Sequence, residues 1–223
     1  MTDLALLRLL QLVSAGLPIG MYSYSQGMET AVEDGLINNA NETGEWITGL
    51  LLNCQVYVDV PLASRLYDAW LNNDLTEVAS LSSTLLACRE TSELREEDQQ
   101  TGQALARLLD EMQMSEASHW KRNPDTTLAT LFTCAAVKWT ISKQAALSGY
   151  LWSWLENQIV CAIKLVPLGQ VAGQQLLHEL AATIPECVEQ GVQITDHEIG
   201  GSAFGLALAS SRHEIQYTRL FRS

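Results

Sequence analysis

Side chains able to bind a metal ion come closest together between residues 187 and 198. A thiolate, an imidazole and a carboxylate, here Cys187, His197 and Glu198, can hold a soft or borderline metal ion. The nine-residue gap after Cys187 matches no standard site, and the four histidines are far apart along the chain. The sequence therefore favours ordinary surface residues here, and we expect no metal ligands.

Sequence motifs that perform catalysis are missing. Neither a Walker loop nor a GxGxxG fingerprint occurs, so nucleotide hydrolysis by this chain alone is not expected. HExxH, CxxC and the GxSxG nucleophile elbow are also absent. Carboxylates are plentiful, but the sequence places no pair of them in one pocket. We therefore expect a protein that is not an enzyme and has no catalytic residues.

The last twelve residues have the chemistry of an interface. Arginine and aromatic side chains are frequent anchors of protein interfaces, and Arg219, Leu220, Phe221 and Arg222 follow one another here. The helical pattern places Arg212, Gln216 and Arg219 on one face of the last helix. The alternative is that the Leu-Phe pair tucks back into the chain's own core.

A second polar and aromatic stretch runs from Tyr22 to Glu29, at the start of an expected helix over 21–35. One interpretation is that Ser23 or Ser25 is the N-cap of that helix. The other is a contact surface, because tyrosine suits positions where one end is buried and the other wet.

The helix expected over 144–170 is apolar around most of its circumference, which is typical of a helix buried on nearly all sides. It is predicted to be the spine of the domain. Its polar residues, Ser153, Glu156, Asn157 and Lys164, fall on one narrow seam. Because Glu156 and Lys164 are too far apart to pair, Lys164 needs a partner elsewhere. The alternative is that Lys164 extends its head to water over apolar neighbours.

Helical periodicity covers most of the chain, and no segment alternates at period two for long enough to be a strand. The sequence predicts an all-α fold, one domain over 1–223 forming a bundle of about nine or ten helices, with a partner-binding tail over about 212–223. Helices are expected over 3–14, 21–35, 45–70 with a break at Pro61, 75–90, 91–113, 127–142, 144–166, 168–184 and 202–217.

Local pairings follow from the same pattern. Asp59, just before Pro61, is expected to cap the second half of its helix. Arg89 and Glu93 are expected to pair at i,i+4. Residues 186–201 are expected to be irregular. The other expected caps are Asp3, Asn41 or Thr43, and Asp125 or Thr126.

Composition limits the partners. The 223-residue chain carries a net charge of −13, concentrated in its first 125 residues, which disfavours nucleic acid and anionic lipid and attracts basic proteins or cations. Five widely spaced cysteines and no export signal indicate buried thiols in the cytoplasm. No apolar run is long enough for a membrane helix.

Four segments, in this order and at these separations, resemble the urease accessory protein UreF family: LPIGMYSYSQGME, RETSELREEDQQTGQ, GYLWSWLENQIVCAIKLVPLGQ and HEIQYTRLFRS. The resemblance spans nearly the whole chain. It implies an all-helical, non-enzymatic chaperone that forms a homodimer and binds the accessory protein UreD (also called UreH). It also implies recruitment of the GTPase UreG and nickel insertion into apo-urease. No cofactor is expected on this chain, with nickel passing through the complex.

The resemblance also assigns residues. Lys164 matches a family lysine associated with control of the GTPase. Gln26 and Ile215 stand where the family often has His and Thr, which puts a metal role at position 26 in doubt. The candidate partner-binding residues are Tyr22, Ser23, Tyr24, Ser25, Gln26, Glu29, Arg212, His213, Gln216, Tyr217, Arg219, Leu220, Phe221 and Arg222.

Other functions remain open at this stage. A helical enzyme with a metal or small-molecule site in the polar seam predicts turnover by the chain alone. A metal-transfer protein predicts stoichiometric nickel on the isolated chain, and the scarcity of clustered His and Cys counts against it. A GTPase-activating regulator predicts that Lys164 stabilises charge on a hydrolysing nucleotide.

Overall fold

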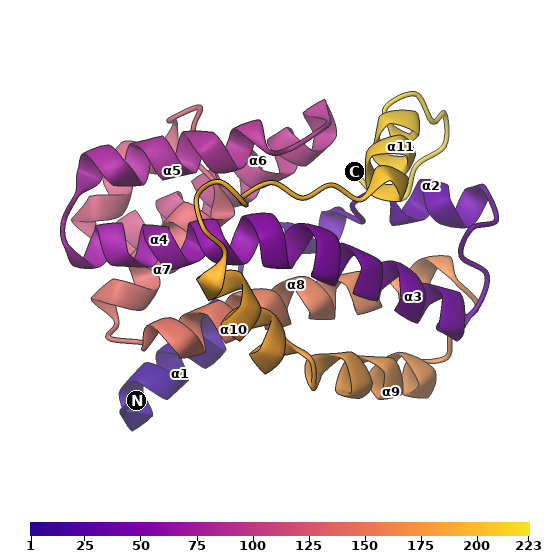
Figure 1. Ribbon diagram of the computed structural model, residues 1–223, viewed down its shortest axis with the longest axis horizontal. Coiled ribbons are helices and arrows are strands. Elements are labelled where there is room, and N and C mark those ends of the chain that lie inside the picture. Colours follow the sequence, from indigo (N-terminus) through magenta and orange to yellow (C-terminus); the bar gives the residue numbers. More distant parts are fainter.

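The computed structural model describes residues 1–223 and is all-α, as predicted, with eleven α-helices and no strand (Figure 1). The number is slightly above the expected nine or ten, because residues 186–193, which were expected to be irregular, belong to helix α10. The helices are α1 Asp3–Leu12, α2 Met28–Glu33, α3 Ala40–Leu50, α4 Val60–Leu71, α5 Leu75–Ala87, α6 Ser92–Glu111, α7 Leu128–Lys138, α8 Lys143–Leu165, α9 Gln170–Ala181, α10 Ile184–Gln193 and α11 Phe204–His213.

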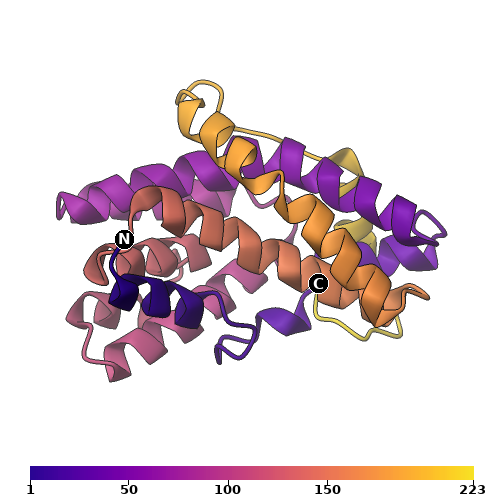
Figure 2. The same cartoon turned by 90° about the horizontal axis from the view of Figure 1, so that it is seen from below.

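Helix α8 is the centre of the bundle, as its sequence predicted. It runs through the middle of the molecule and packs against α1, α2, α3, α4, α7, α9 and α10 (Figures 1 and 2). Its buried side chains belong to one continuous core of 56 buried apolar residues. The polar seam is only half-buried at Ser153, Glu156 and Asn157, and Lys164 is exposed.

The expected break near Pro61 is absent. A π-helical segment, Leu51–Asp59, joins α3 to α4, and Pro61 lies in the first turn of α4. Asp59 stays in helical geometry and makes no cap hydrogen bond, so the predicted cap is wrong. Its carboxylate accepts instead from the Arg89 guanidinium, with Nη2 at 2.6 Å from Oδ1.

Arg89 does not pair with Glu93 as expected, because it precedes the first turn of α6 and points inward. Its Nε donates to Asp98 Oδ2 at 2.6 Å, while Tyr150 donates to Asp59 Oδ1 at 3.2 Å. Burial acts to lower the pKa of Arg89, but the two aspartates beside it outweigh burial and raise it. This buried ion cluster ties α6 to the π-helical segment and α8.

The expected helix ends differ from the observed ones. The side chains that cap α1, α3 and α7 are Thr2, Asn39 and Thr127, each within four residues of the one expected. Residues 184–193 form helix α10, with Pro185 at its start instead of after the preceding helix.

Helix α1 turns its leucine stripe outward. Leu4, Leu7 and Leu10 are exposed, whereas Ala5 and Leu12 are buried (α1 lies alongside α8 in Figure 2). The periodic leucines therefore do not contribute to this chain's own core.

Glycine permits a close contact between α6 and α7. A Cβ at Gly102 of α6 would lie 2.5 Å from the carbonyl carbon of Thr127, at the start of α7. Any side chain there would push the two helices apart.

No helix is both long enough and apolar enough to cross a membrane. All five cysteines are free, and four are buried. Burial raises the pKa of Cys54 to about 11 and those of Cys134 and Cys161 to about 12, so these thiols stay protonated.

Candidate partner-binding site

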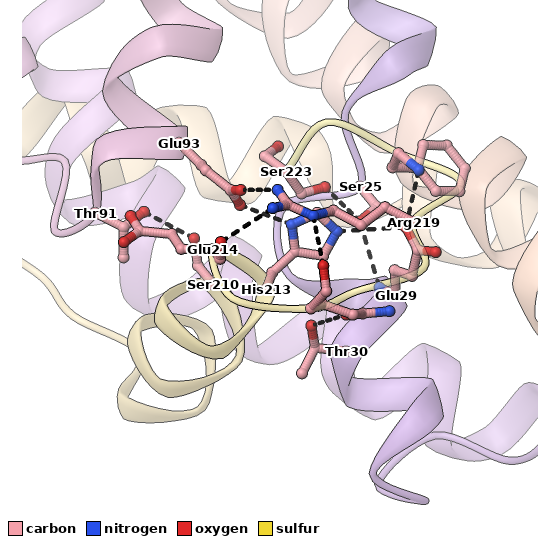
Figure 3. Close-up of polar contacts among 12 residues, drawn as sticks. Ser25, Glu29, Thr30, Thr91, Glu93, Ser210, His213, Glu214, Arg219 and Ser223 are labelled. Carbon is pink, nitrogen blue, oxygen red and sulfur yellow. Dashed lines mark hydrogen bonds and ion pairs between the residues drawn. The ribbon is translucent and has the colours of Figure 1, made fainter.

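The two stretches singled out by sequence, 21–29 and 213–223, lie side by side (Figure 3). Residues 214–223, which follow α11 and are called the tail below, pair with the loop before α2 through main-chain hydrogen bonds. Arg222 N donates to Ser23 O at 2.8 Å, and Ser25 N donates to Ser223 O at 2.8 Å. Ser25 Oγ also donates to Ser223 O, at 2.6 Å.

Glu29, in the first turn of α2, holds the main chain of the tail. Its carboxylate accepts from Leu220 N at 2.6 Å and from Phe221 N at 2.8 Å. The N-cap of α2 is Gly27, so neither Ser23 nor Ser25 is the N-cap, although Ser25 Oγ accepts from Glu29 N at 3.3 Å. A charged acceptor makes these hydrogen bonds stronger than those of a neutral one.

His213, the last residue of α11, is fully buried between two carboxylates. Its Nδ1 lies 2.7 Å from Glu93 Oε2, and its Nε2 lies 3.4 Å from Glu29 Oε2. Arg219 Nη1 donates to the second oxygen of Glu93 at 2.7 Å. One histidine and one arginine therefore join α2, α6, α11 and the tail, as Figure 3 shows.

Glu97, one turn after Glu93 on α6, is the third carboxylate of the cluster. It accepts from Gln26 Nε2 at 2.8 Å and from Ser223 Oγ at 3.0 Å. Burial raises the pKa of Glu97 to about 7, with Asp98 adding to the shift and the Gln26 hydrogen bond opposing it. The other end of Gln26 accepts from Trp154 Nε1 at 2.8 Å, so Gln26 links α6 to α8.

Lys164 finds its partner in the tail. Its Nζ lies 5.4 Å from the centroid of the buried Phe221 ring, a cation–π contact. Every other lysine pairs with a carboxylate: Lys121 with Asp110, Lys138 with Glu116 and Lys143 with Asp68. Lys164 thus keeps an exposed ammonium free of any anion.

The candidate residues fall into three groups by exposure. The buried ones, which hold the tail, are Tyr24, Ser25, Glu29, His213 and Phe221. Those open to solvent are Tyr22, Arg212, Tyr217, Arg219, Leu220 and Arg222, and Ser23, Gln26 and Gln216 are half-buried. Because α11 ends at His213, Gln216 and Arg219 do not share a helical face with Arg212 as expected.

The candidate residues did not include Glu93, Glu97 or Ser223, although Ser223 ends the C-terminal segment that resembles the family. The sequence predicts for Glu93 only a pair with Arg89, and it makes no prediction for Glu97. Glu93 and Glu97 are like charges at i,i+4, which destabilises an isolated helix. That spacing was the signal that both carboxylates have partners on other elements.

A small enclosed cavity lies beneath the tail cluster. Its volume is about 60 Å³, and it is lined by Gln26 and Glu97 on one side and by the Arg89 ion cluster on the other. The buried Gln55 Oε1 in its wall has no hydrogen-bond partner in the protein. The cavity is therefore large enough for water and has in its wall a polar atom that lacks a partner in the protein.

The geometry contains no arrangement suited to metal binding. No group of three or more His, Cys, Asp or Glu side chains could hold an ion. In the stretch 187–198, His197 and Glu198 are exposed as expected of surface residues, whereas Cys187 is buried. The carboxylates of Glu29, Glu93 and Glu97 instead bind the tail of the chain itself. The fold and site define an all-helical protein that fixes an ordered tail and displays aromatic, apolar and arginine side chains from it.

Comparison with known proteins places the chain within a family. Residues 37–181 match the UreF family model. A urease accessory protein UreF of Alkalilimnicola ehrlichii is 50% identical over 220 residues, covering 99% of this chain and 96% of that protein. The proteins of the same description from Azoarcus sp. and Hahella chejuensis are 47% and 42% identical, over 99% and 100% of this chain and 96% and 100% of their own. The chain belongs to the UreF family.

We predict that Glu29→Gln loosens the tail without unfolding the bundle. The neutral amide is a weaker acceptor for the two tail N–H groups and loses its charge toward His213. Hydrogen exchange of the Leu220 and Phe221 amides should accelerate by about ten- to a hundredfold. Glu33→Gln, on the exposed end of the same helix, is the control. Equal protection of the tail amides from hydrogen exchange in both variants would contradict the role of Glu29 in holding the tail.

We predict that Glu97→Gln removes a pH-dependent decrease in the free energy of unfolding. Because the folded pKa of Glu97, about 7, lies above the ordinary 4.5, ionising this carboxylate destabilises the fold as pH rises from 4.5 to 7. The variant should gain stability relative to the parent across this window, by at most about 3 kcal/mol above pH 7. Denaturant unfolding at several pH values measures it, with the exposed Glu96→Gln as control. If the difference in unfolding free energy between variant and parent did not change with pH, the raised pKa of Glu97 would be refuted.

Proposed function

We propose that this chain is a non-enzymatic urease accessory protein that acts in the cytoplasm. It binds the accessory protein UreD (UreH), and the pair recruits the GTPase UreG so that nickel is inserted into apo-urease. Nickel is the cargo of this assembly. The relatives' description as urease accessory proteins supports the role, and the absence of an arranged reactive group in this chain is consistent with an adaptor.

The observation that carries the proposal is that some side chains of the tail are buried while their neighbours are exposed. Phe221 is 5% exposed and packs in the core, whereas its neighbour Leu220 is 64% exposed and Tyr217 is fully exposed. Large apolar side chains are not left in water on an ordered segment without cost, and they are typical interface anchors. Tyr22 and Arg222 extend the same surface.

The homodimer is proposed on a different face. The exposed leucines of α1 border an apolar groove that contains no charged residue, between α1, α8 and the start of α10. Uncharged apolar faces are typical of homodimer interfaces. The mass of the isolated chain in solution, measured by light scattering, tests this assignment.

Control of GTP hydrolysis is proposed for Lys164. Its exposed ammonium has no carboxylate beside it, and the Phe221 ring fixes its position. A cation so placed can stabilise negative charge that develops on a nucleotide bound to a docked GTPase.

We predict that replacing Tyr217 and Leu220 together by serine abolishes co-purification of UreD while helical content stays unchanged. Neither side chain supports the fold, so loss of binding reports on the surface itself. Val171→Ser, an exposed apolar residue of α9, is the control. Deleting 218–223 is less informative, because it also leaves Glu29 without its donors. Full retention of UreD by the double variant would refute the tail surface.

We predict that Lys164→Ala leaves the complex with UreD and UreG assembled and changes its rate of GTP hydrolysis. The rate should change because the positive charge is lost, and Lys164→Arg should preserve most of it. Hydrolysis is measured by phosphate release from the purified complex. An unchanged rate with alanine would show that Lys164 only covers Phe221.

A further inference from the structure

A second pocket, which is partly open to solvent, lies apart from the tail cluster, against the polar seam of α8. It is framed by the end of α1 and the loop after it, by α6 and α7, and by the middle of α8. Its volume is about 60 Å³. Most of the wall is apolar and is formed by Leu12, Val13, Leu17, Ile19, Leu105 and Phe132.

One charged side chain, that of Glu156, belongs to this wall. Its neighbours along the seam are satisfied, since Ser153 Oγ donates to Tyr150 O at 2.9 Å and Asn157 Nδ2 donates to Tyr24 O at 2.9 Å. The half-buried Glu156 takes part in no hydrogen bond or ion pair within the chain. Burial raises its pKa, and no neighbouring donor or cation opposes that shift.

An unpaired carboxylate in an apolar wall is energetically unfavourable until a cation or donor reaches it. A basic side chain meets both features of the pocket at once. Its alkyl stem is apolar and its head is positive, so the stem packs on the apolar wall while the head pairs with the carboxylate.

We propose that this pocket receives a lysine or arginine side chain of the partner accessory protein, with Glu156 pairing its charged head. The assignment rests on the proposed function. Tyr22 lines the pocket and is 61% exposed, so the opening continues the surface proposed to bind the partner. The net charge of −13 favours a basic partner over an acidic one.

The first experiment needs no partner. The full chain is titrated with n-butylguanidinium, which carries the head and stem of an arginine, and amide shifts are followed by NMR. Saturable shifts are expected at residues lining the pocket, and Glu156→Gln should weaken binding about tenfold or more. Glu189→Gln, an unpaired and exposed carboxylate of α10, should bind as the parent does. Shifts that do not saturate, or equal affinity in both variants, would overturn the proposal.

A second variant guards against an uninformative result at position 156. Val160→Phe adds bulk to the pocket wall while keeping every charge, and it should weaken the same titration. Circular dichroism establishes that each variant is folded. Undiminished binding by a folded Val160→Phe chain would overturn the location.

The partner experiment then tests the occupant. Glu156→Gln should lower the affinity for purified UreD about tenfold, with Glu189→Gln unaffected. Equal affinity of the two variants for UreD would overturn a partner side chain as the occupant. Failure of the parent chain itself to bind UreD would refute the proposed function instead, while the guanidinium titration still decides whether the pocket binds a basic group.

Discussion

A carboxylate removed from water must be given donors, and this requirement organises the whole end of the molecule that carries the tail. Glu29, Glu93 and Glu97 are each less than 10% exposed. Their donors come from main-chain amides, a histidine, an arginine and a serine that all lie at or beyond residue 213, with Gln26 alone from the N-terminal loop. Without the tail, Glu29 and Glu93 would keep only His213 and Glu97 would keep only Gln26, so three buried carboxylates would lose most of their donors and the fold would be destabilised.

The same arrangement separates stability from recognition. Alternate tail residues have opposite tasks: Phe221 and Ser223 face the bundle, whereas Leu220 and Arg222 face solvent. A substitution facing inward changes the position of everything that the tail displays, including the ammonium over Phe221. A substitution facing outward changes only the displayed chemistry. The two classes can therefore be told apart by whether the protection of the tail changes.

Much of the fold could be predicted from periodicity. The apolar circumference of α8 identified the central helix, because burial on all sides leaves a direct mark on the sequence. The spacing of Leu4, Leu7 and Leu10 was equally regular, yet those residues face outward, since a periodic stripe shows that a face is apolar and does not say what covers it. Asp59 was assigned locally, although its partner Arg89 is 30 positions away.

The candidate site was predictable in its parts and not in its assembly. The two polar, aromatic stretches could be recognised from composition and from family resemblance. That the two stretches lie together could not be predicted, because the local sequence around Glu93 and Glu97 does not indicate a partner more than 100 residues later.

The hydrogen bond between Ser25 and Ser223 spans 198 positions of sequence. Closing so long a loop is entropically costly. This cost is offset only once the bundle between the two ends has formed. We therefore expect the displayed surface to form after the bundle. A chain that is incomplete or locally misfolded would fail to present it, so engagement by a partner would also certify that folding had finished.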